Sequence, residues 1–343
     1  MSGKSQSGST PPFISVIVVN FNGKKFLQAC LSSLENQDYP KERLECILVD
    51  NGSTDGSVEL VESSFPWVHL VEAGKNLGFA GGNNLGMRVA RGDFFALLNN
   101  DTETPPDWVS SLVQAIQHSP SFGMGASKIL LHHDHGIINS TGLILLPDGR
   151  GKDRGFHERD LGQFEKTDEV FGACGAGVLL RREMLEEIGL FDERLFMYYE
   201  DLDLAWRAKR AGWKCVYAPK ARVYHIHCGS SGSWSPFFTF HVERNRALVS
   251  AKNAGLIQAV RSVGTVFAKT TMRIIQGVVP GERFRLAGVY CKVALSLFRH
   301  LPAVLFNRWF CPRANSSWLS KNQPKCKDQR GKTPPDGAWR ASA

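Results

Sequence analysis

The residues with the clearest chemistry stand where an apolar segment ends. Phe94–Leu98 is an apolar run typical of a buried strand, and Asn99, Asn100 and Asp101 follow it directly. A carboxylate at the end of a buried strand is a suitable oxygen ligand for a divalent cation. The same three residues would also form an ordinary turn, so this segment alone does not distinguish a metal site from a turn.

Two earlier predicted strands end in polar side chains of the same kind. Ile14–Val19 is followed by Asn20 and Asn22, and Leu44–Val49 is followed by Asp50. Because parallel strands end at one edge of a sheet, we expect these side chains near those that follow the later strand. Asp50 either begins a turn that caps the next helix or accepts a hydrogen bond from the imide N–H of a nucleotide base. No G-x-G-x-x-G fingerprint follows the first strand, which argues against a dehydrogenase.

The segment NLGFAGGNN, residues 76–84, combines glycines with amides. Glycines such as Gly78 allow the backbone to approach a ligand closely, and amides such as Asn76 and Asn83 supply donors for phosphate or sugar oxygens. The alternative is a glycine-rich loop that simply precedes a helix.

A further acidic segment, residues 197–203, reads MYYEDLD. If a helix begins near Glu200, then Asp201 shares a face with the apolar residues that follow and is directed at the interior or at a cleft. Glu200 shares another face with Asp203 and Arg207, which are spaced to pair, so we expect these three residues to support the structure. An acid at a helix N-terminus also serves simply as a partner of the helix dipole.

Five segments in a fixed order resemble glycosyltransferase family 2, most of all its bacterial rhamnosyltransferase-like members. The resemblance covers about residues 13–250 and rests on VIVVNFN, VDNGSTDGS, NLGFAGGNN, LLNND and the long stretch from FGACGAG to VYHIH. It implies an α/β fold of the GT-A type, with a Rossmann-like mixed sheet, and an inverting enzyme. It also implies a nucleotide-diphospho-sugar donor and a glycan or lipid-linked glycan acceptor.

The resemblance also implies roles for individual residues. Asp101 would hold Mg²⁺ or Mn²⁺ against the donor diphosphate, with Asn99 where the family's Asp-x-Asp has its first acid. His225 would complete the metal shell; its alternative role is a loop histidine that caps backbone. Asp201 would be the catalytic base that takes the proton of the acceptor hydroxyl, and a single displacement gives inversion. The expected donor contacts are Asn20, Asn22, Asp50, Asn76, Gly78, Asn83, Asn100 and Arg154.

Three further features allow two interpretations each. Arg154 stands in a segment that resembles a substrate loop and would contact either the donor diphosphate or an anionic acceptor. The cluster His132–His135 is better explained by a surface loop than by a metal site. Trp234 and the segment Arg244–Arg246 either close over the diphosphate or begin a C-terminal helix.

Composition limits the class of protein. The 343 residues are 43% hydrophobic and 22% charged, which is ordinary for a globular protein. The net charge is +8, but the basic excess lies beyond Ala254 and the preceding part is mildly acidic, which argues against a nucleic-acid-binding core. Cys46, Cys174 and Cys215 lie in apolar runs, as expected for free thiols in a reducing compartment. With no signal peptide and no stretch of ~18 uncharged apolar residues, we expect a cytoplasmic protein without a spanning helix.

We expect four regions: disordered ends at 1–12 and 311–343, a catalytic domain at 13–250 and a helical, basic region at 251–310. The helical region either lies on the inner face of an anionic membrane or forms a hairpin packed on the catalytic domain. The other expected strands are 68–71, 125–131, 138–146, 177–180 and 215–217. The expected helices are 24–35, 55–62, 82–90, 106–118 and 200–211.

Alternative functions remain open from the sequence. dTDP-rhamnose is the expected donor from resemblance alone, and a UDP-hexose is the main alternative. A nucleotidyltransferase would need a glycine-rich, basic loop directly after the first strand, which Asn20–Gly23 does not provide. A degenerate nucleotide-sugar-binding protein is disfavoured by the intact Asp101 and Glu200–Asp201, although Asn99 is compatible with it.

Overall fold

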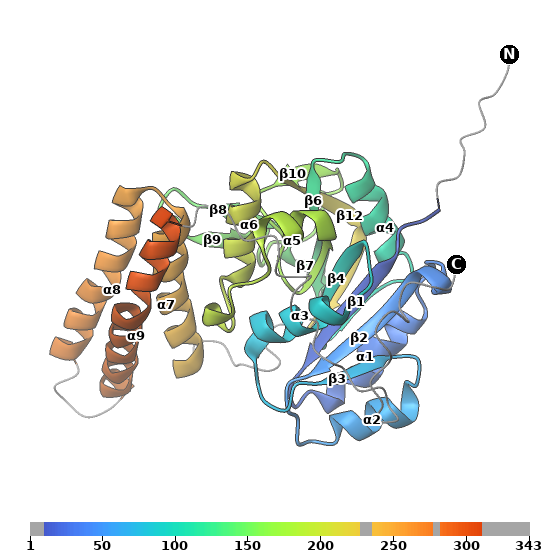
Figure 1. Cartoon of the computed structure of the whole chain (residues 1–343), viewed down its shortest axis with the longest axis horizontal. Coiled ribbons are helices and arrows are strands. Elements are labelled where there is room, and N and C mark those ends of the chain that lie inside the picture. Colours follow the sequence, from blue (N-terminus) through green and yellow to red (C-terminus); the bar gives the residue numbers. More distant parts are fainter. Residues whose placement is uncertain (1–9, 227–234, 277–281, 311–343) are drawn as a thin grey trace, which may run out of the picture.

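The structure, a computed structural model, describes residues 10–226, 235–276 and 282–310 of the chain. The two ends that we expected to be disordered fall outside these ranges, apart from residues 10–12, and so does Trp234. The described residues form an α/β body with three packed helices at one end of it (Figure 1).

The elements alternate between strand and helix in the first half of the chain and become irregular after it. The helices are α1 Lys24–Glu35, α2 Ser57–Ser64, α3 Gly78–Val89, α4 Trp108–Gln117, α5 Arg182–Ile188, α6 Glu200–Arg210, α7 Pro236–Asn253, α8 Leu256–Gln276 and α9 Glu282–Phe310. The strands are β1 Ile14–Asn20, β2 Leu44–Asp50, β3 His69–Glu72, β4 Phe94–Asn99, β5 Thr102–Glu103, β6 Phe122–Leu131, β7 Asp134–Ser140, β8 Leu143–Leu145, β9 Gly151–Asp153, β10 Asp168–Val170, β11 Gly177–Arg181 and β12 Lys214–His225.

The main sheet runs in the order β10-β12-β6-β11-β4-β1-β2-β3, with β5 paired to β12 and β7 to β6. Strands β1 to β4 pair in parallel, whereas β11 runs antiparallel between β4 and β6. The expected α/β fold with a mixed sheet is therefore confirmed. The register places Asn20 beside Asp50 and Val19 beside Asn99, so the polar ends of β1, β2 and β4 meet at one end of the sheet.

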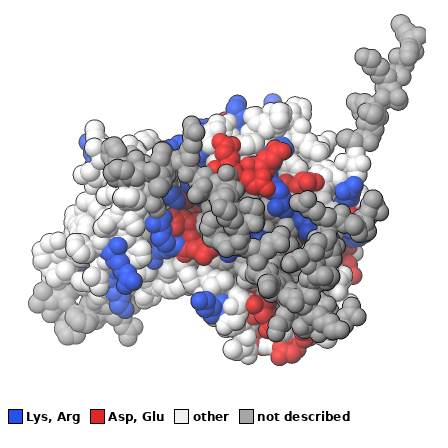
Figure 2. Space-filling model, viewed as in Figure 1, with Lys and Arg blue, Asp and Glu red and all other residues white. Residues whose placement is uncertain are grey.

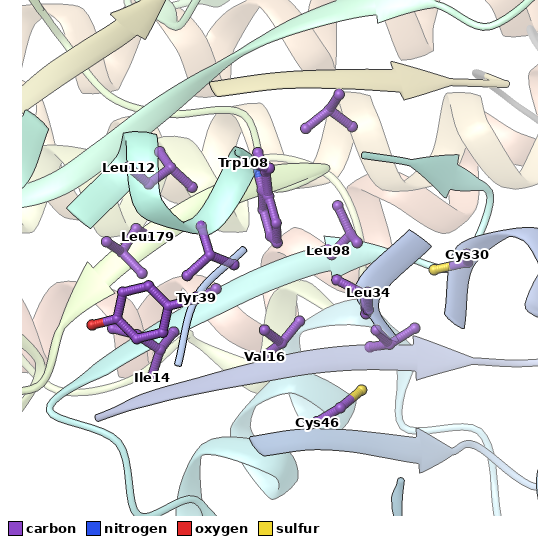
Figure 3. Packing of buried hydrophobic residues seen from close by; sticks show 14 of the residues in the cluster. Ile14, Val16, Cys30, Leu34, Tyr39, Cys46, Leu98, Trp108, Leu112 and Leu179 are labelled. Atoms are coloured by element: carbon purple, nitrogen blue, oxygen red, sulfur yellow. The ribbon is translucent and has the colours of Figure 1, made fainter. Parts of the chain in front are cut away.

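Helices cover both faces of the sheet and give the body three layers (Figure 1). One face packs on α1 and α4 through Leu31, Trp108 and Leu112, all fully buried. Figure 3 shows this core, with Val16 of β1 among its residues. The opposite face packs on α3, α5 and α6, and Ile17 of β1 belongs to that second core. The continuous apolar run of β1 is thus explained by burial on both faces.

Several expected elements differ from the structure. The predicted strand 138–146 is two strands, β7 and β8, because the chain turns between them with a φ of +107° at Gly142. The predicted strand 215–217 continues to His225, where it reaches the polar end of the sheet. Helix α3 begins at Gly78 rather than at residue 82, so most of the glycine-rich segment is helical. The short elements β5, β9, β10 and α5 lack the repeated pattern that would distinguish them from loops.

Helices α7, α8 and α9 pack around a hydrophobic core of their own (Figure 1). Leu248, Val266, Val293 and Leu297 lie in it and are at most 3% exposed. Helix α7 crosses residue 250, where we expected the catalytic domain to end. The C-terminal group of packed helices therefore begins with α7, before the expected boundary at residue 250.

One stretch among the described residues, Leu286–Phe306 of α9, is long and apolar enough to cross a membrane by length and composition. This differs from the expectation of no such helix, because the stretch remains apolar on average despite Lys292 and Arg299. Only 22% of its most apolar part is buried inside the protein.

Candidate active site

A cavity of about 1000 Å³ lies at the end of the sheet where β1 and β4 finish. Its wall includes the start of α3, the hairpin β8–β9, the loop before α6 and the start of α7. Its charged and amide side chains are Asn51, Asn76, Asn99, Asn100, Asp101, Asn139, Lys152, Asp153, Glu200, Asp201 and His225. The cavity thus combines carboxylates with a size that suits a small-molecule ligand.

Asp101 and His225, two of the expected metal residues, meet in this cavity. Pairing of β5 with β12 places His225 opposite Thr102, and Nε2 of His225 lies 3.2 Å from Oδ1 of Asp101. Nδ1 of the same ring lies 2.7 Å from Oδ1 of Asn139. Asn139 therefore accepts the Nδ1 proton and orients the ring with Nε2 toward Asp101, an arrangement typical of a histidine that ligates a metal.

The carboxylate of Asp101 and the imidazole of His225 are suitable ligands for a divalent cation, although these two residues alone do not surround one. Asn99 presents Nδ2 to Nε2 of His225 at 3.4 Å, so its amide must turn over before its oxygen becomes a ligand. No group of three or more His, Cys, Asp or Glu side chains in the described ranges is arranged to hold a metal ion. A cation held by Asp101 and His225 would need oxygen ligands from a bound diphosphate or from water.

Asp201 lies in the same cavity at the start of α6. Its Oδ1 accepts a hydrogen bond from the N–H of Leu202 at 2.7 Å, and Oδ2 accepts a long one from Gly175 at 3.4 Å. Burial raises the pKa of Asp201 above its usual range, and the backbone hydrogen bonds oppose this only in part. A carboxylate with raised proton affinity is suited to act as a general base.

Glu200 lies in the cavity wall as well, which differs from its expected place on a structural face. It is the first residue of α6 and follows directly on the loop that forms the wall. The residue is 5% exposed, and among the described residues its Oε2 has no hydrogen-bond partner. Burial, together with the adjacent Asp201, raises the pKa of Glu200 well above its usual range. Both acids at the start of α6 therefore hold a proton more readily than exposed carboxyls do.

Asp203 and Arg207 pair as expected. Nε of Arg207 and Nζ of Lys252 both lie 2.9 Å from Oδ2 of Asp203, and Asn253 donates to Oδ1 at 2.8 Å. Burial would raise the pKa of Asp203, but Lys252 and Arg207 outweigh it and hold the pKa below the usual range. This buried network joins α6 to α7 and fixes the helix that carries Asp201.

The loop before α6 has an unusual backbone. Phe196, Tyr198 and Tyr199 have φ values of 65° to 70°, a region that favours glycine. Nδ2 of Asn245 on α7 donates to three carbonyl oxygens of this loop at 2.8 to 2.9 Å. The segment Arg244–Arg246 lies in the middle of α7 and does not line the cavity, so it holds the loop rather than closing over a ligand.

Three of the residues expected to contact the nucleotide-sugar donor line the cavity: Asn76, Gly78 and Asn100. Gly78 has a φ of +71°, and a Cβ there would lie 2.5 Å from the carbonyl oxygen of Phe196, so the position requires glycine. Oδ1 of Asn76 accepts a hydrogen bond from the N–H of Gly78 at 2.8 Å. These residues shape the wall at the N-terminus of α3.

The other expected donor contacts at this edge do not line the cavity. Asp50 accepts hydrogen bonds from two backbone N–H groups of its own turn, at 3.0 and 2.8 Å, and from Nδ2 of Asn20 at 3.2 Å. Asn22 and Asn83 likewise bond to backbone groups. The turn interpretation of Asp50 therefore describes its contacts, since its carboxylate completes the loop between β2 and α2.

Asn51, the residue after Asp50, is the one that lines the cavity. Its Nδ2 donates to the carbonyl oxygen of Gly78 at 3.0 Å, and its Oδ1 has no partner in the part of the chain that the structure describes. The only signal in the sequence was its position beside Asp50.

Arg154 is held away from the cavity, contrary to expectation. Its Nη1 lies 2.8 Å from Asp168, and its guanidinium lies over the rings of Phe164 and Tyr217. The preceding residues of the same segment, Lys152–Asp153, line the cavity instead. No pattern in the sequence distinguishes these two residues from Arg154, because the pairing of β9 with β8 decides which of them faces the ligand.

His132 and His133 form the turn between β6 and β7, as expected for a surface loop, and Asp134 and His135 begin β7. His132 lies 2.7 Å from Glu103, and His135 stacks on Tyr224. The thiols of Cys46 and Cys215 are buried and free.

Solved structures share the fold. A mannosyltransferase from Pyrobaculum calidifontis, in complex with GDP-Man and Mn²⁺, has a TM-score of 0.52 at 17% identity and covers 88% of both chains. S. aureus TarS 1-349, in complex with UDP-GlcNAc, has a TM-score of 0.51 at 17% identity and covers 87% of this chain and 89% of the other. The fold is therefore that of a GT-A glycosyltransferase.

The family model described as glycosyl transferase family 2 matches residues 15–189, and the chain belongs to this family. It is 30% identical over 247 residues to the N-acetylglucosaminyl-diphospho-decaprenol L-rhamnosyltransferase of Mycobacterium tuberculosis, covering 63% of this chain and 77% of that one. It is 28% identical over 243 residues to the amylovoran biosynthesis glycosyltransferase AmsB of Erwinia amylovora, covering 65% and 75%. The protein is a glycosyltransferase, similar to rhamnosyltransferases.

Proposed function

We propose that this glycosyltransferase moves a sugar, with inversion, from a nucleoside diphosphate to a hydroxyl of a lipid-linked or cell-surface glycan. Similarity to the mycobacterial rhamnosyltransferase supports dTDP-rhamnose as the donor. A UDP-hexose is the alternative, since a structural neighbour binds UDP-GlcNAc. The observation that carries the proposal is that the Asp101–His225 pair and Asp201 line one cavity.

Each group of cavity residues has a separate role in the proposed transfer. Asp101 and His225 would hold Mg²⁺ or Mn²⁺, which when bound counters the charge of a diphosphate leaving group. Helix α3 begins at Gly78 in the wall, and its N-terminal end favours a phosphate there. Oδ1 of Asn51 is open to a donor group of the nucleotide. Asp201 removes the proton of the acceptor hydroxyl, which attacks the anomeric carbon from the side opposite the diphosphate.

The test is release of nucleoside diphosphate by the full chain from dTDP-rhamnose, UDP-glucose, UDP-GlcNAc and GDP-mannose. Each donor is supplied with Mn²⁺ or Mg²⁺ and N-acetylglucosaminyl-diphospho-polyprenol as the acceptor probe. Metal-dependent transfer from dTDP-rhamnose is expected. Transfer only from another sugar nucleotide would show that dTDP-rhamnose is not the donor. Release of nucleoside diphosphate from none of them would indicate a nucleotide-sugar-binding protein without transferase activity.

Two variants test the proposed metal corner. Asp101→Ala should lower metal-supported transfer about 100-fold or more, because it removes the carboxylate ligand. Asn99→Asp should retain transfer or lower the metal concentration required, because it adds a second carboxylate beside Asp101. Normal transfer by Asp101→Ala would contradict the assignment.

We also propose that α8 and α9 place the enzyme on the cytoplasmic face of an anionic membrane. Both helices pack inward along one side and leave large apolar side chains exposed. These exposed side chains are Leu256, Ile257, Val260, Phe267, Met272, Ile274, Ile275, Leu295, Phe298, Leu305 and Phe306. Basic residues stand beside them, and Glu282 is the one acid between residues 255 and 310. At this end of the molecule, charged atoms visible over α8 and α9 are those of Lys and Arg (Figure 2).

Both earlier interpretations of this region contribute to the proposal. The helices pack on α7, as the hairpin interpretation required, and their outer faces remain apolar and basic, as an interfacial position requires. Phe298→Glu, at a side chain 77% exposed, should weaken co-sedimentation with phosphatidylglycerol vesicles at low salt. Leu161→Glu, at a side chain 83% exposed on the body, is the matched control. Wild-type protein that stays in the supernatant would contradict the proposal.

A further inference from the structure

The acid Asp153 has no role in the mechanism described above, although it lines the same cavity as Asp101 and Asp201. It ends β9, the second strand of the hairpin β8–β9, which lies outside the main sheet. Gly151 of the same strand packs so closely on Leu202 that a Cβ would lie 2.9 Å from it. The hairpin is therefore fixed against the first turn of α6, beside Asp201.

Asp153 is influenced by residues of both proposed roles, the base Asp201 and the metal ligand His225. Ser140 and Cys174 act on its carboxyl to lower the pKa, and Asp201 and His225 are charged groups that influence it. Ser140 directly follows Asn139, which bonds to His225. The end of β7 thus positions both the metal-corner histidine and this acid. In a transfer reaction the donor sugar must lie between the diphosphate and the attacking hydroxyl, and Asp153 lines the cavity that holds the proposed metal residues and the proposed base.

The carboxyl of Asp153 is also incompletely bonded. Its Oδ1 has no hydrogen-bond partner within the described ranges. A buried carboxylate oxygen without a donor costs free energy, and in a cavity wall a ligand is able to supply that donor. Burial raises the pKa of Asp153 to about 6, with a further contribution from Asp201, so that the acid is mainly ionised at neutral pH and acts as an acceptor.

We propose that Asp153 recognises the transferred sugar by accepting a hydrogen bond from one of its ring hydroxyl groups. This inference rests on the proposed transferase function and adds a residue that selects the donor sugar. A site built to bond a hydroxyl strongly rejects an analogue that lacks it, because its own polar group is then left unpaired. Donor sugars that lack a hydroxyl at the matching position should therefore bind weakly.

The test compares two affinities in the full chain, those for dTDP-rhamnose and for dTDP, each with Mn²⁺ present, by titration calorimetry. UDP-glucose and UDP form a second pair for the alternative donor. Asp153→Ala should weaken binding of the sugar nucleotide about 10- to 100-fold and leave binding of the nucleoside diphosphate unchanged, because only the sugar makes the bond. Asp153→Asn keeps the shape of the side chain and should show the same selective loss to a smaller extent.

Asp148→Ala is the matched control, since Asp148 lies in the turn of the same hairpin and pairs with Arg150 at the surface. It should change neither affinity. Equal losses for both members of a pair in the Asp153 variants, or no loss in either, would overturn the inference. So would normal binding of the sugar nucleotide with complete loss of transfer, because Asp153 would then be a base. If the wild-type protein binds none of the sugar nucleotides, the proposed function itself fails. This outcome is distinct from failure of the inference about Asp153, because it is measured without any variant.

Discussion

Two groups of polar side chains lie near the end of the same sheet, and their hydrogen bonding differs. Asn20 and Asp50, at the ends of β1 and β2, bond to each other. Asp50 also accepts from two backbone N–H groups of its own loop, and Asn20 bonds to the side chains of Ser53 and Asn100. Asp153 and Glu200, across the cavity, each keep a carboxyl oxygen that lacks a partner in the described residues, and both have raised pKa values. In these two groups, completed hydrogen bonds occur in residues that complete their own loops, whereas the unpartnered oxygens belong to acids of the cavity wall.

The same contrast occurs within one helix. On α6, Asp203 is fully buried and bonded to Arg207, Lys252 and Asn253, whereas Asp201 accepts only backbone hydrogen bonds and lines the cavity. Two acids that are two residues apart therefore have opposite pKa shifts for a physical reason: one is surrounded by cations and the other is not.

The largest effect is expected at Asp201. Asp201→Asn should lower the rate of sugar transfer about 10³-fold or more, because the amide cannot take the acceptor proton. The affinity for the donor should stay within a few-fold, and the melting temperature should not fall, since a buried charge is removed. Rates of transfer, donor binding and thermal unfolding measure the three effects. Full activity of the variant would remove the role of Asp201 as base.

The next largest effect is on stability. Lys252 bridges Asp203 and Asp192, with both carboxylates mostly buried. Lys252→Ala should lower the free energy of unfolding by about 3 kcal/mol, because it leaves buried acids with fewer cations. Lys214→Ala, which removes an exposed pair with Glu169, should cost about 0.5 kcal/mol or less. Denaturant unfolding of both variants would show the difference, and equal losses would argue that the buried network is unimportant.

A matched pair of neighbouring substitutions tests the two polar groups directly. Asp50→Asn should lower the free energy of unfolding by about 1–3 kcal/mol and leave the KM for the donor nearly unchanged, because its bonds are to the loop. Asn51→Ala should raise that KM several-fold with a smaller loss of stability. Steady-state kinetics and thermal unfolding separate the outcomes. A large rise in KM for Asp50→Asn with no loss of stability would restore Asp50 as the nucleotide contact.

Local patterns predicted the parallel half of the sheet closely. Helix α1 has the predicted bounds Lys24–Glu35, and β1, β2 and β4 extend one residue beyond their predicted ends. These elements are long, apolar on the buried side and ended by polar residues, so their periodicity is clear. The meeting of Asp101 with His225 was expected from resemblance alone, because it depends on the pairing of β5 with β12 across more than a hundred residues.

The choice between neighbouring residues was not predictable from the sequence. Asn51 rather than Asp50, and Lys152–Asp153 rather than Arg154, line the cavity. In both cases residues one position apart differ in whether they line the cavity, and long-range packing decides which of them do. The outer faces of α8 and α9 raise the same difficulty, since an apolar residue on a helix is equally compatible with a core and with an exposed interface.

The smallest expected effect is a pH dependence of stability that has opposite signs in the two kinds of acid. Asp153 ionises near pH 3.9 in the unfolded chain and at about 6 in the folded protein. Between these values the folded state binds more protons, so the free energy of unfolding falls as the pH rises from about 4 to about 6 and is constant above that. Asp203 has a lowered pKa, so its contribution is present above about pH 4 and is lost as the pH falls further.

Wild-type protein should therefore melt at a higher temperature near pH 5 than at pH 7.5, and at a lower temperature below about pH 4. Asp153→Asn cannot ionise, so it should lose about 1 kcal/mol of the change between pH 5 and 7.5, while Glu200 and Asp201 retain theirs. Thermal unfolding across this range, with Asp168→Asn as an exposed control, measures it. An unchanged pH dependence in Asp153→Asn would mean that burial does not raise the pKa of this carboxyl, and the contrast between acids with complete and incomplete hydrogen bonding would then rest on Glu200 alone.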